Sequence, residues 1–373
     1  MTRLCTAFLV FLFTCLSIVH AFEGLPHKPP ATITVGVRGD ARPFSYITTT
    51  RANEDILAGY GGYMIEICRR VLSEMVVNGP FQGYQVEPIE VTAESRLPDL
   101  DSGRIDMLCG PDSITLSRLY KYNTSHPVFL SGITYVTVED DMFPRTRYCG
   151  PIIGLVANTT AETEGLRKIA DSDELQLYDS ALESFLSEYA DLNEGSGIDV
   201  DGDVNLFIKG MKNDFGIDSE SSGGQNKVPP QSVKTAICPN GFDKGPVVFY
   251  DTHEQGIADL CEGKILFYVG DIDIISDRIG NCRVITRRET LTREAYGVYF
   301  RRPQDILLTA DSETPEQHYP DSELYSEFNN VLIRKMQTAE NILDYEFHNE
   351  FKNESPTEDL QSFFDSYKFV VDY

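Results

Sequence analysis

The sequence predicts an α/β protein with two lobes, and three observations lead to this prediction. The chain has 373 residues, which is more than one compact hydrophobic core usually supports. A unit of helix, glycine, buried strand and polar loop occurs at residues 94–113 and again at residues 250–271. Each unit ends in polar or charged side chains. Because open α/β sheets bind ligands at the carboxyl ends of their strands, we expect the two units to share a ligand site.

Residues 1–21 are predicted to be a targeting segment. Arg3 supplies the positive end, residues 7–19 form the apolar run, and Val19-His20-Ala21 is a small-residue cleavage site. The apolar run is too short to span a bilayer. We therefore expect the mature chain to be exported, as a soluble periplasmic or secreted protein.

The composition excludes several classes of function. The chain carries 58 acidic and 32 basic residues, a formal net charge of -26, which disfavours binding to nucleic acid or anionic lipid. Its six histidines are scattered without ligand spacing, so no metal and no cofactor is expected. Residues 188–245 predict an acidic insertion with little apolar periodicity. Its D-V-D-G-D run resembles a calcium loop but has the glycine in the wrong place, so we interpret the run as solvated acids.

Six cysteines remain once the targeting segment is removed, and an even number in an oxidising compartment predicts disulfides. Cys68 lies on the first expected helix and Cys109 at the end of the neighbouring strand, so a bridge between them is predicted. The other four cysteines fall in the second lobe, where three pairings are open: Cys149, Cys238, Cys261 and Cys282.

The first lobe is expected to begin with TITVGVRGDARPFSY, a strand that runs into a loop. A helix over GGYMIEICRRVLSEMV and a strand over YQVEPIEV follow. Residues 94–102 predict a short helix ended by Gly103, and RIDMLC a buried strand. Thr115 can cap the next helix, which carries Arg118 in its first turn. A hydroxyl, free N–H groups and a guanidinium therefore converge at a strand end, and a carboxylate fits there.

The second lobe is expected to open after the strand SGITYVTV. PIIGLVANTTAETEGLRKIA predicts a strand, a tight turn and a helix whose start carries a capping box of Thr159 and Glu162. LQLYDS and KILFYVG predict further strands, the second with Asp271 at its carboxyl end. TREAYGVYFRR predicts the return crossing, and the helical residues 322–351 are expected to pack on the first lobe. Residues 356–373 could cover that lobe or a partner.

The loop G-P-D-S-I-T-L-S-R, with Ser125 and Pro127 after it, resembles the signature of type 2 periplasmic solute-binding proteins for polar amino acids, bacterial extracellular solute-binding protein family 3. The resemblance implies that Arg118 grips the ligand α-carboxylate with help from Ser113. It also implies that Asp271 pairs with the α-ammonium. A cation and an anion on opposing lobes would then select a zwitterion by the distance between its two charges.

The resemblance implies further ligand contacts. Asn158, Thr159 and Thr160 would close over the ligand, Tyr63 would stack on it, and Arg38 would contact a side-chain carboxylate as in members that bind glutamate or aspartate. Phe44 and Pro111 would line the cleft. Simpler interpretations are a solvated loop arginine for residue 38, a core tyrosine for residue 63, and helix caps for Thr159 and Asp271.

Together these features predict the two-lobed periplasmic binding protein type II fold with two hinge crossings. Lobe 1 would comprise residues 22–131 and 295–373, and lobe 2 residues 132–294. The predicted protein is a monomer without catalytic activity that closes on an amino acid and delivers it to an inner-membrane ABC importer. One alternative is a secreted dehydratase acting on prephenate or arogenate, with Asp112 and Glu94 as candidate acids. Another is a sensory ligand-binding module.

Overall fold

A computed structural model of the chain describes residues 31–49, 56–139, 153–170, 247–286, 289–302, 320–338, 340–352 and 354–368. Several sequence-based predictions lie outside these residues: the targeting segment, the acidic insertion with its D-V-D-G-D run, the LQLYDS strand, Cys149 and Cys238. Within the described residues, no helix combines the length and apolar character needed to cross a bilayer.

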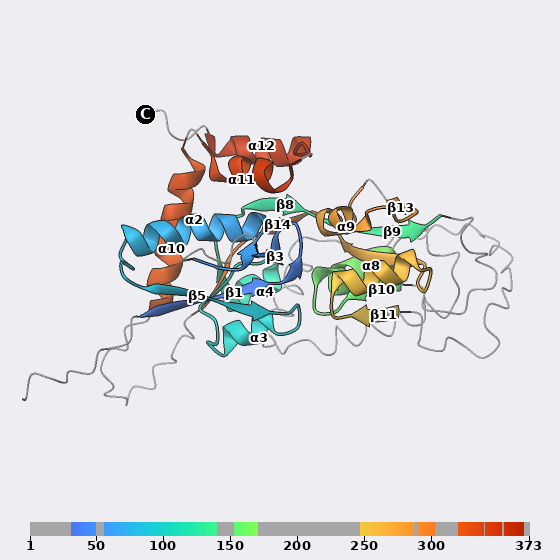
Figure 1. Cartoon of the computed structure of the whole chain (residues 1–373), viewed down its shortest axis with the longest axis horizontal. Helices are drawn as coiled ribbons and strands as arrows, with labels where there is room; N and C mark the ends of the chain where they lie inside the picture. Colours follow the sequence, from blue (N-terminus) through green and yellow to red (C-terminus); the bar gives the residue numbers. More distant parts are fainter. Residues whose placement is uncertain are drawn as a thin grey trace, which may run out of the picture.

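The described chain forms two lobes, each built on a five-stranded sheet (Figure 1). The sheet of lobe 1 has the order β5-β1-β6-β15-β7, with β1 parallel to β5 and β6 and with β15 antiparallel to its neighbours. Its strands are β1 (Thr32–Arg38), β5 (Gln85–Val91), β6 (Met107–Leu108), β7 (Tyr122–Thr124) and β15 (Tyr299–Arg301). A small sheet beside it contains β2 (Asp40–Ala41), β3 (Ser45–Ile47) and β4 (Tyr60–Gly61).

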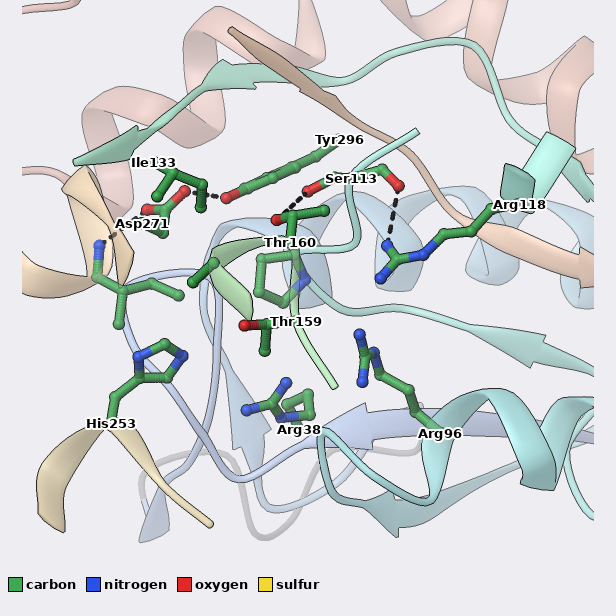
Figure 2. Close-up of a pocket in the computed structure, with 13 residues that line it drawn as sticks. Arg38, Arg96, Ser113, Arg118, Ile133, Thr159, Thr160, His253, Asp271 and Tyr296 are labelled. Atoms are coloured by element: carbon green, nitrogen blue, oxygen red, sulfur yellow. Dashed lines mark hydrogen bonds between the residues drawn. The ribbon is translucent and has the colours of Figure 1, made fainter. Parts of the chain in front are cut away.

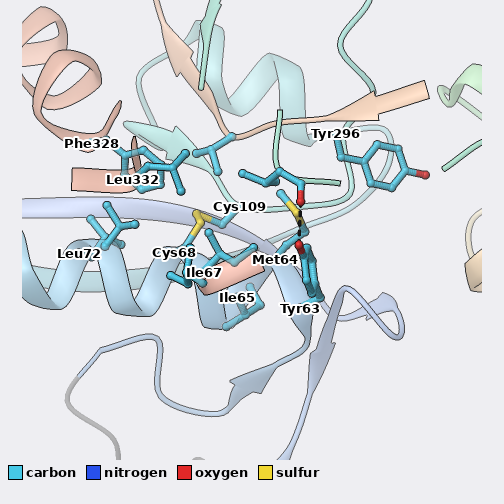
Figure 3. Close-up of a cluster of buried hydrophobic side chains, with 14 of the residues drawn as sticks. Tyr63, Met64, Ile65, Ile67, Cys68, Leu72, Cys109, Tyr296, Phe328 and Leu332 are labelled. Carbon is cyan, nitrogen blue, oxygen red and sulfur yellow. Dashed lines mark hydrogen bonds between the residues drawn. A yellow bond between two sulfur atoms is a disulfide. The ribbon is translucent and has the colours of Figure 1, made fainter. Parts of the chain in front are cut away.

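Helix α2 (Tyr63–Val77) is the central helix of lobe 1, because its apolar residues recur at helical spacing and are buried. The helix starts after Gly62, whose φ of 115° favours glycine and where an added Cβ would clash with the Phe44 carbonyl oxygen. The Cys68–Cys109 disulfide joins α2 to the end of β6, as predicted (Figure 3). The lobe also contains α3 (Arg96–Asp101) and α4 (Leu116–Lys121).

The carboxyl-terminal helices return to lobe 1, as the sequence predicts. Both α10 (Pro320–Met336) and α11 (Ile342–Glu350) pack on α2. The following helix, α12 (Glu358–Ser366), packs on α11 and on β8 (Phe129–Ser131). The first part of the extension therefore covers lobe 1, whereas residues 369–373 lie outside the described part.

The sheet of lobe 2 has the order β11-β10-β12-β9-β13, with β10 parallel to β11 and β12 and with β9 antiparallel to β12 and β13. A Cys261–Cys282 disulfide lies in this lobe and is one of the pairs that the sequence left open. The described elements of lobe 2 are β9 (Ile133–Val138), β10 (Ile153–Val156), the π-helix η3 (Ala161–Gly165), α5 (Leu166–Ala170), β11 (Val247–Tyr250), α8 (His253–Cys261), β12 (Phe267–Asp271), α9 (Ile272–Ile279) and β13 (Val284–Thr286).

The two lobes are joined by β8 and β14 (Glu294–Tyr296), which pair antiparallel with Ser131 opposite Glu294. The sequence predicts the two crossings near residues 128–132 and 294–295, the residues around which these two strands pair. This two-stranded ribbon forms a sheet of its own, separate from the two five-stranded sheets (Figure 1).

Two helix starts test the predicted caps. The Thr115 side chain accepts a hydrogen bond from the Arg118 N–H, so α4 is capped as predicted. The predicted capping box in lobe 2 is wrong. The Thr159 hydroxyl donates to the Val156 carbonyl, and the Glu162 carboxylate accepts from the Asn158 N–H. Asn158 adopts a left-handed conformation with φ 59°. The N-cap of the helix is Thr160, one residue later than predicted, and its side chain makes no capping hydrogen bond.

Candidate ligand-binding site

A pocket lies between the two lobes and is lined by side chains from both (Figure 2). It encloses about 410 Å³ of empty space, part of which is continuous with solvent. Its lining residues are Arg38, Arg96, Pro111, Ser113, Arg118, Ile133, Thr159, Thr160, Ala161, His253, Asp271, Ile274 and Tyr296.

Seven of the ten predicted ligand contacts line this pocket. They come from five separate stretches of the chain: Arg38, Pro111, Ser113, Arg118, Thr159, Thr160 and Asp271. The other three lie elsewhere. Tyr63 and Phe44 are fully buried in the core of lobe 1, and Asn158 is exposed.

Tyr63 is held in the core by both ends of its side chain. Its hydroxyl donates to the Val128 carbonyl at 2.7 Å, and its ring packs edge-on against Phe129 with centroids 5.1 Å apart. Phe44 packs edge-on against Tyr296, which itself lines the pocket. The two predicted aromatic contacts thus support the pocket from behind and do not line it.

Arg38 reaches the pocket from the end of β1. Its guanidinium forms a two-pronged ion pair with Asp40, with Nε 2.6 Å from Oδ1 and Nη2 2.8 Å from Oδ2. Asp40 therefore neutralises Arg38, and the Arg38 guanidinium lowers the pKa of the Asp40 carboxyl against the opposing effect of burial. The arginine is buried and its position is fixed, unlike that of a solvated loop residue.

Arg96, which the sequence did not single out, enters the pocket from α3 with only 3% of its surface exposed. Its Nε donates to Asp112 Oδ1 at 2.6 Å, and its Nη2 donates across the cleft to the Asn158 carbonyl at 2.8 Å. Within the described residues, Arg96 Nη1 and Asp112 Oδ2 are buried without a hydrogen-bond partner. Burial, opposed by Asp112 and reinforced by Arg118 and Arg38, lowers the pKa of Arg96.

Arg118 completes a set of three guanidinium groups facing one pocket. Its Nη1 donates to the Ser113 carbonyl at 2.9 Å, and the Tyr299 hydroxyl donates to the same oxygen at 2.6 Å. Figure 2 shows the three arginines along one part of the pocket, with Asp271 and Tyr296 at the opposite end. The arginine part of the pocket is therefore rich in hydrogen-bond donors.

Asp271 lies at the end of β12, where it both caps α9 and lines the pocket. Its Oδ1 accepts from the N–H groups of Asp273 and Ile274, at 2.9 and 3.0 Å. Its Oδ2 accepts from the hydroxyls of Ser131, at 2.6 Å, and of Tyr296. Burial raises the pKa of Asp271 to about 6, although these hydrogen bonds act against the rise.

Glu294 organises the hydroxyl groups beside Asp271. This buried carboxylate accepts from Ser113, from Thr160 at 2.8 Å and from Thr292 at 2.9 Å. Each hydroxyl has one hydrogen, so Ser113 and Thr160 turn their oxygen lone pairs toward other groups. This part of the pocket can therefore accept hydrogen bonds from a cationic or neutral donor.

His253, a second residue missed from the sequence, starts α8 and faces the pocket from lobe 2. Its Nδ1 lies 2.8 Å from the Tyr268 hydroxyl. Burial, with a further contribution from Arg38, lowers the pKa of His253 to about 3, so the ring is neutral near pH 7. Scattered histidines without ligand spacing gave no sequence signal for this position.

Four more lining residues carried no sequence signal that separates them from core residues: Ile133, Ala161, Ile274 and Tyr296. Tyr296 was visible only as part of the predicted return crossing. Neither candidate acid of the dehydratase alternative is among the described lining residues. Asp112 is paired with Arg96, and Glu94 is exposed. Within the described chain, no cluster of three or more side chains suited to a metal ion occurs.

Comparisons with known proteins identify the family. Residues 33–344 match the bacterial extracellular solute-binding proteins, family 3. The chain belongs to this family. Its described lobes have the two-lobed type II periplasmic binding protein fold, with helices flanking each mixed sheet.

The chain is also similar to individual proteins. It is 25% identical over 173 residues to a glutamate/aspartate import solute-binding protein of Salmonella typhimurium strain LT2, a match that covers 43% of this chain and about half, 53%, of that relative. A mutant of ArgBP from T. maritima aligns with a TM-score of 0.52 and 15% identity over 87% of this chain and 96% of the other. The arginine-, lysine-, histidine-binding protein ArtJ of Geobacillus stearothermophilus gives 0.51 and 14%, over 88% and 99%.

Proposed function

We propose that this protein captures an amino acid with an acidic side chain, glutamate or aspartate, and delivers it to an ABC importer. The observation that carries the proposal is the set of three arginines around one pocket, with a buried Arg96 Nη1 that lacks an acceptor within the described residues. A buried donor without a partner costs about 1–3 kcal/mol, and a carboxylate oxygen would remove that cost.

The three arginines differ in their hydrogen-bond and ion-pair partners, and these differences support different roles in ligand binding. Arg38 and Arg96 each have a carboxylate partner, whereas Arg118 has none within the described residues and donates to a backbone carbonyl. Arg118 is therefore suited to the ligand α-carboxylate. Arg38 and Arg96 lie where a second carboxylate, on the ligand side chain, would find further donors.

The acceptor end of the pocket suits the ligand ammonium. Asp271 supplies the negative charge, and the hydroxyl oxygens of Ser113 and Thr160 add lone pairs because Glu294 takes their hydrogens. Arg118 stands on lobe 1 and Asp271 on lobe 2, so the ligand would bridge the lobes and favour their closure.

The similarity to a glutamate/aspartate import protein supports the same ligand class. Membership of an extracellular solute-binding family supports export of the mature chain and transfer of the ligand to a membrane importer. We propose that the protein acts as a monomer that opens and closes, with lobe 1 built from residues 22–131 and 295–373 and lobe 2 from residues 132–294. It requires no catalysis.

Isothermal titration with glutamate, aspartate, glutamine, asparagine and arginine tests the ligand class. We expect glutamate or aspartate to bind at least tenfold more tightly than the matching amide, which has the same shape without the charge. At 100 times its dissociation constant, a ligand should stabilise the protein by about 2.7 kcal/mol. Preference for arginine or for the amides would contradict the proposal. Incubation with prephenate should yield no phenylpyruvate.

A further inference from the structure

We propose that Asp273 holds a proton that leaves when an amino acid binds, so that affinity depends on pH through a pair of carboxyl groups joined by Ser131. The inference rests on the proposed function for its ligand, because Asp271, the other member of the pair, is there the partner of the ammonium group. Asp273 does not line the pocket; it would act through Asp271 as a positioning residue.

The geometry around Ser131 requires an extra proton. The Ser131 Oγ lies 2.6 Å from Asp271 Oδ2 and 2.7 Å from Asp273 Oδ2. A serine hydroxyl has one hydrogen and can donate it to one of these oxygens. If both carboxyl groups were ionised, the other short contact would join two oxygens with no hydrogen between them. One carboxyl group of the pair must therefore be protonated.

The surroundings decide which group carries the proton. Asp271 accepts hydrogen bonds from two backbone N–H groups, from Ser131 and from Tyr296, and these favour its ionised form. Ser131 is the hydrogen-bond partner of the Asp273 side chain within the described residues. The proton therefore resides on Asp273, which donates to Ser131 Oγ, and Ser131 donates to Asp271.

The nearby charges reinforce this assignment. Burial and the negative charge of Asp271 raise the pKa of Asp273 to about 8, with Glu354 acting in the same direction. The cations Arg42 and Arg278 act on Asp277, one turn further along α9. The titratable groups that act on the pair are Glu294 and Tyr296 from β14 and Glu354 from the segment after α11. The charged or titratable groups that line the pocket beside it are Arg38, Arg96, Arg118 and His253.

Ligand binding would change this balance. An ammonium group beside Asp271 brings a positive charge that favours the doubly ionised pair, so the pKa of Asp273 falls on binding. The Asp273 O–H bond then breaks, its electrons stay on the carboxylate, and the proton passes to the buffer. Affinity should rise with pH until the pH exceeds the Asp273 pKa of the free protein, about 8, and then level off. Near pH 6, protonation of Asp271 should weaken binding further.

The pair also lies at the junction between the lobes. Ser131 belongs to β8 and Tyr296 to β14, the two crossing strands, whereas Asp271 and Asp273 belong to lobe 2. The proton thus sits where a change of charge can influence the lobe angle as well as the ligand.

Titration calorimetry with glutamate in two buffers of different ionisation enthalpy measures the protons released. We expect release approaching one proton at pH 7 and none at pH 9.5. Asp273→Asn should abolish the release, because the amide donates to Ser131 and holds no titratable proton. This variant should still bind, with an affinity that changes less than twofold between pH 6.5 and 8.5, where the wild type gains several-fold. Unchanged proton release in Asp273→Asn would overturn the proposal.

A second measurement needs no ligand and so separates this inference from the proposed function. A group with a raised folded-state pKa stabilises the fold at low pH, and that stability is lost as the pH rises through the folded pKa. The wild type should therefore lose more unfolding free energy than Asp273→Asn between pH 6 and 9. An Asp251→Asn control, at an exposed aspartate of the same lobe, should follow the wild type. If glutamate fails to bind, the proposed function falls. If the unfolding free energies of the wild type and of Asp273→Asn change with pH in the same way, the proposal that Asp273 holds a proton is wrong.

Discussion

Arg118 shows at the residue scale how one side chain can determine affinity. It lines the pocket on lobe 1. Its guanidinium and the Tyr299 hydroxyl both donate to the Ser113 carbonyl, and these bonds fix the loop beside it. Since no carboxylate of the described residues neutralises its guanidinium, a ligand carboxylate would form its principal ion pair. Truncating one partner of a buried, hydrogen-bonded charge pair costs about 2–5 kcal/mol.

Arg118→Ala should therefore weaken glutamate binding at least tens of fold in calorimetry. The matched control is Arg104→Ala, which removes an arginine of the same lobe whose side chain is 54% exposed and paired with Asp99. Exposed pairs contribute about 0–1 kcal/mol, so this control should change affinity less than threefold. Affinity retained in Arg118→Ala would remove the basis of the proposed function.

The Arg96–Asp112 pair makes a second prediction, which concerns stability. Arg96→Met leaves the buried Asp112 carboxylate without its partner and should lower the free energy of unfolding by about 3–5 kcal/mol. The double variant Arg96→Met/Asp112→Leu should recover most of this loss in urea unfolding. Both variants should bind glutamate weakly, because both lack the Arg96 donors. A single variant as stable as the wild type would show that the pair is not buried as described.

At the scale of elements, α12 illustrates how a terminal extension becomes part of a lobe. Phe364 is fully buried by α12 and its neighbours, whereas the adjacent Phe363 is only partly buried. The Asn341 side-chain amide also donates to the Phe364 carbonyl at 2.9 Å. The helix is thus fixed to α11 by packing and by a buried hydrogen bond.

Phe364→Ala should lower the free energy of unfolding by about 3–5 kcal/mol, the usual cost of removing a buried phenylalanine. Phe363→Ala, one position away in the same helix, is the matched control and should cost less than half as much. Equal losses for the two variants, measured by urea unfolding, would mean that α12 is not docked on lobe 1.

At the scale of the whole molecule, hydrogen bonds from two arginines are among those that join the lobes in the described part of the chain. Arg96 Nη2 donates from lobe 1 to the Asn158 carbonyl, and Arg278 Nη2 donates from α9 to the Asp40 carbonyl at 2.6 Å. The Asp40 carboxylate also pairs with Arg38, which lines the pocket, so Asp40 connects the pocket to the Arg278 contact between the lobes. These bonds favour the closed arrangement.

Arg278→Ala removes one of these contacts without removing a lining residue. A hydrogen bond from a charged group contributes about 1.5–3 kcal/mol, so the closed population and the apparent affinity should fall about tenfold or more. Small-angle scattering of the free variant should show a larger radius of gyration than the wild type. Arg167→Ala, at an exposed arginine of lobe 2, should leave both quantities unchanged. Unaltered scattering and affinity in Arg278→Ala would exclude a role in closure.

The sequence by itself determined the features that depend on neighbours along the chain. The left-handed Gly103, the Thr115 cap and the strand ends that carry Ser113 and Asp271 all followed from short patterns. Such patterns suffice because capping, turns and strand ends are decided within a few residues. The resemblance of the loop motif then placed the pocket between the lobes.

Tertiary structure decided the rest. Arg96 and His253 line the pocket, and Glu294 accepts from hydroxyls that line it. Their contacts span 62, 15 and 181 positions of the chain, respectively. Tyr63 and Phe44 belong to the core because the return helices cover the face that a local pattern leaves open. A periodic pattern indicates which residues need burial, but the element that buries them can come from anywhere in the chain. That element also brings the charged side chains that face the ligand.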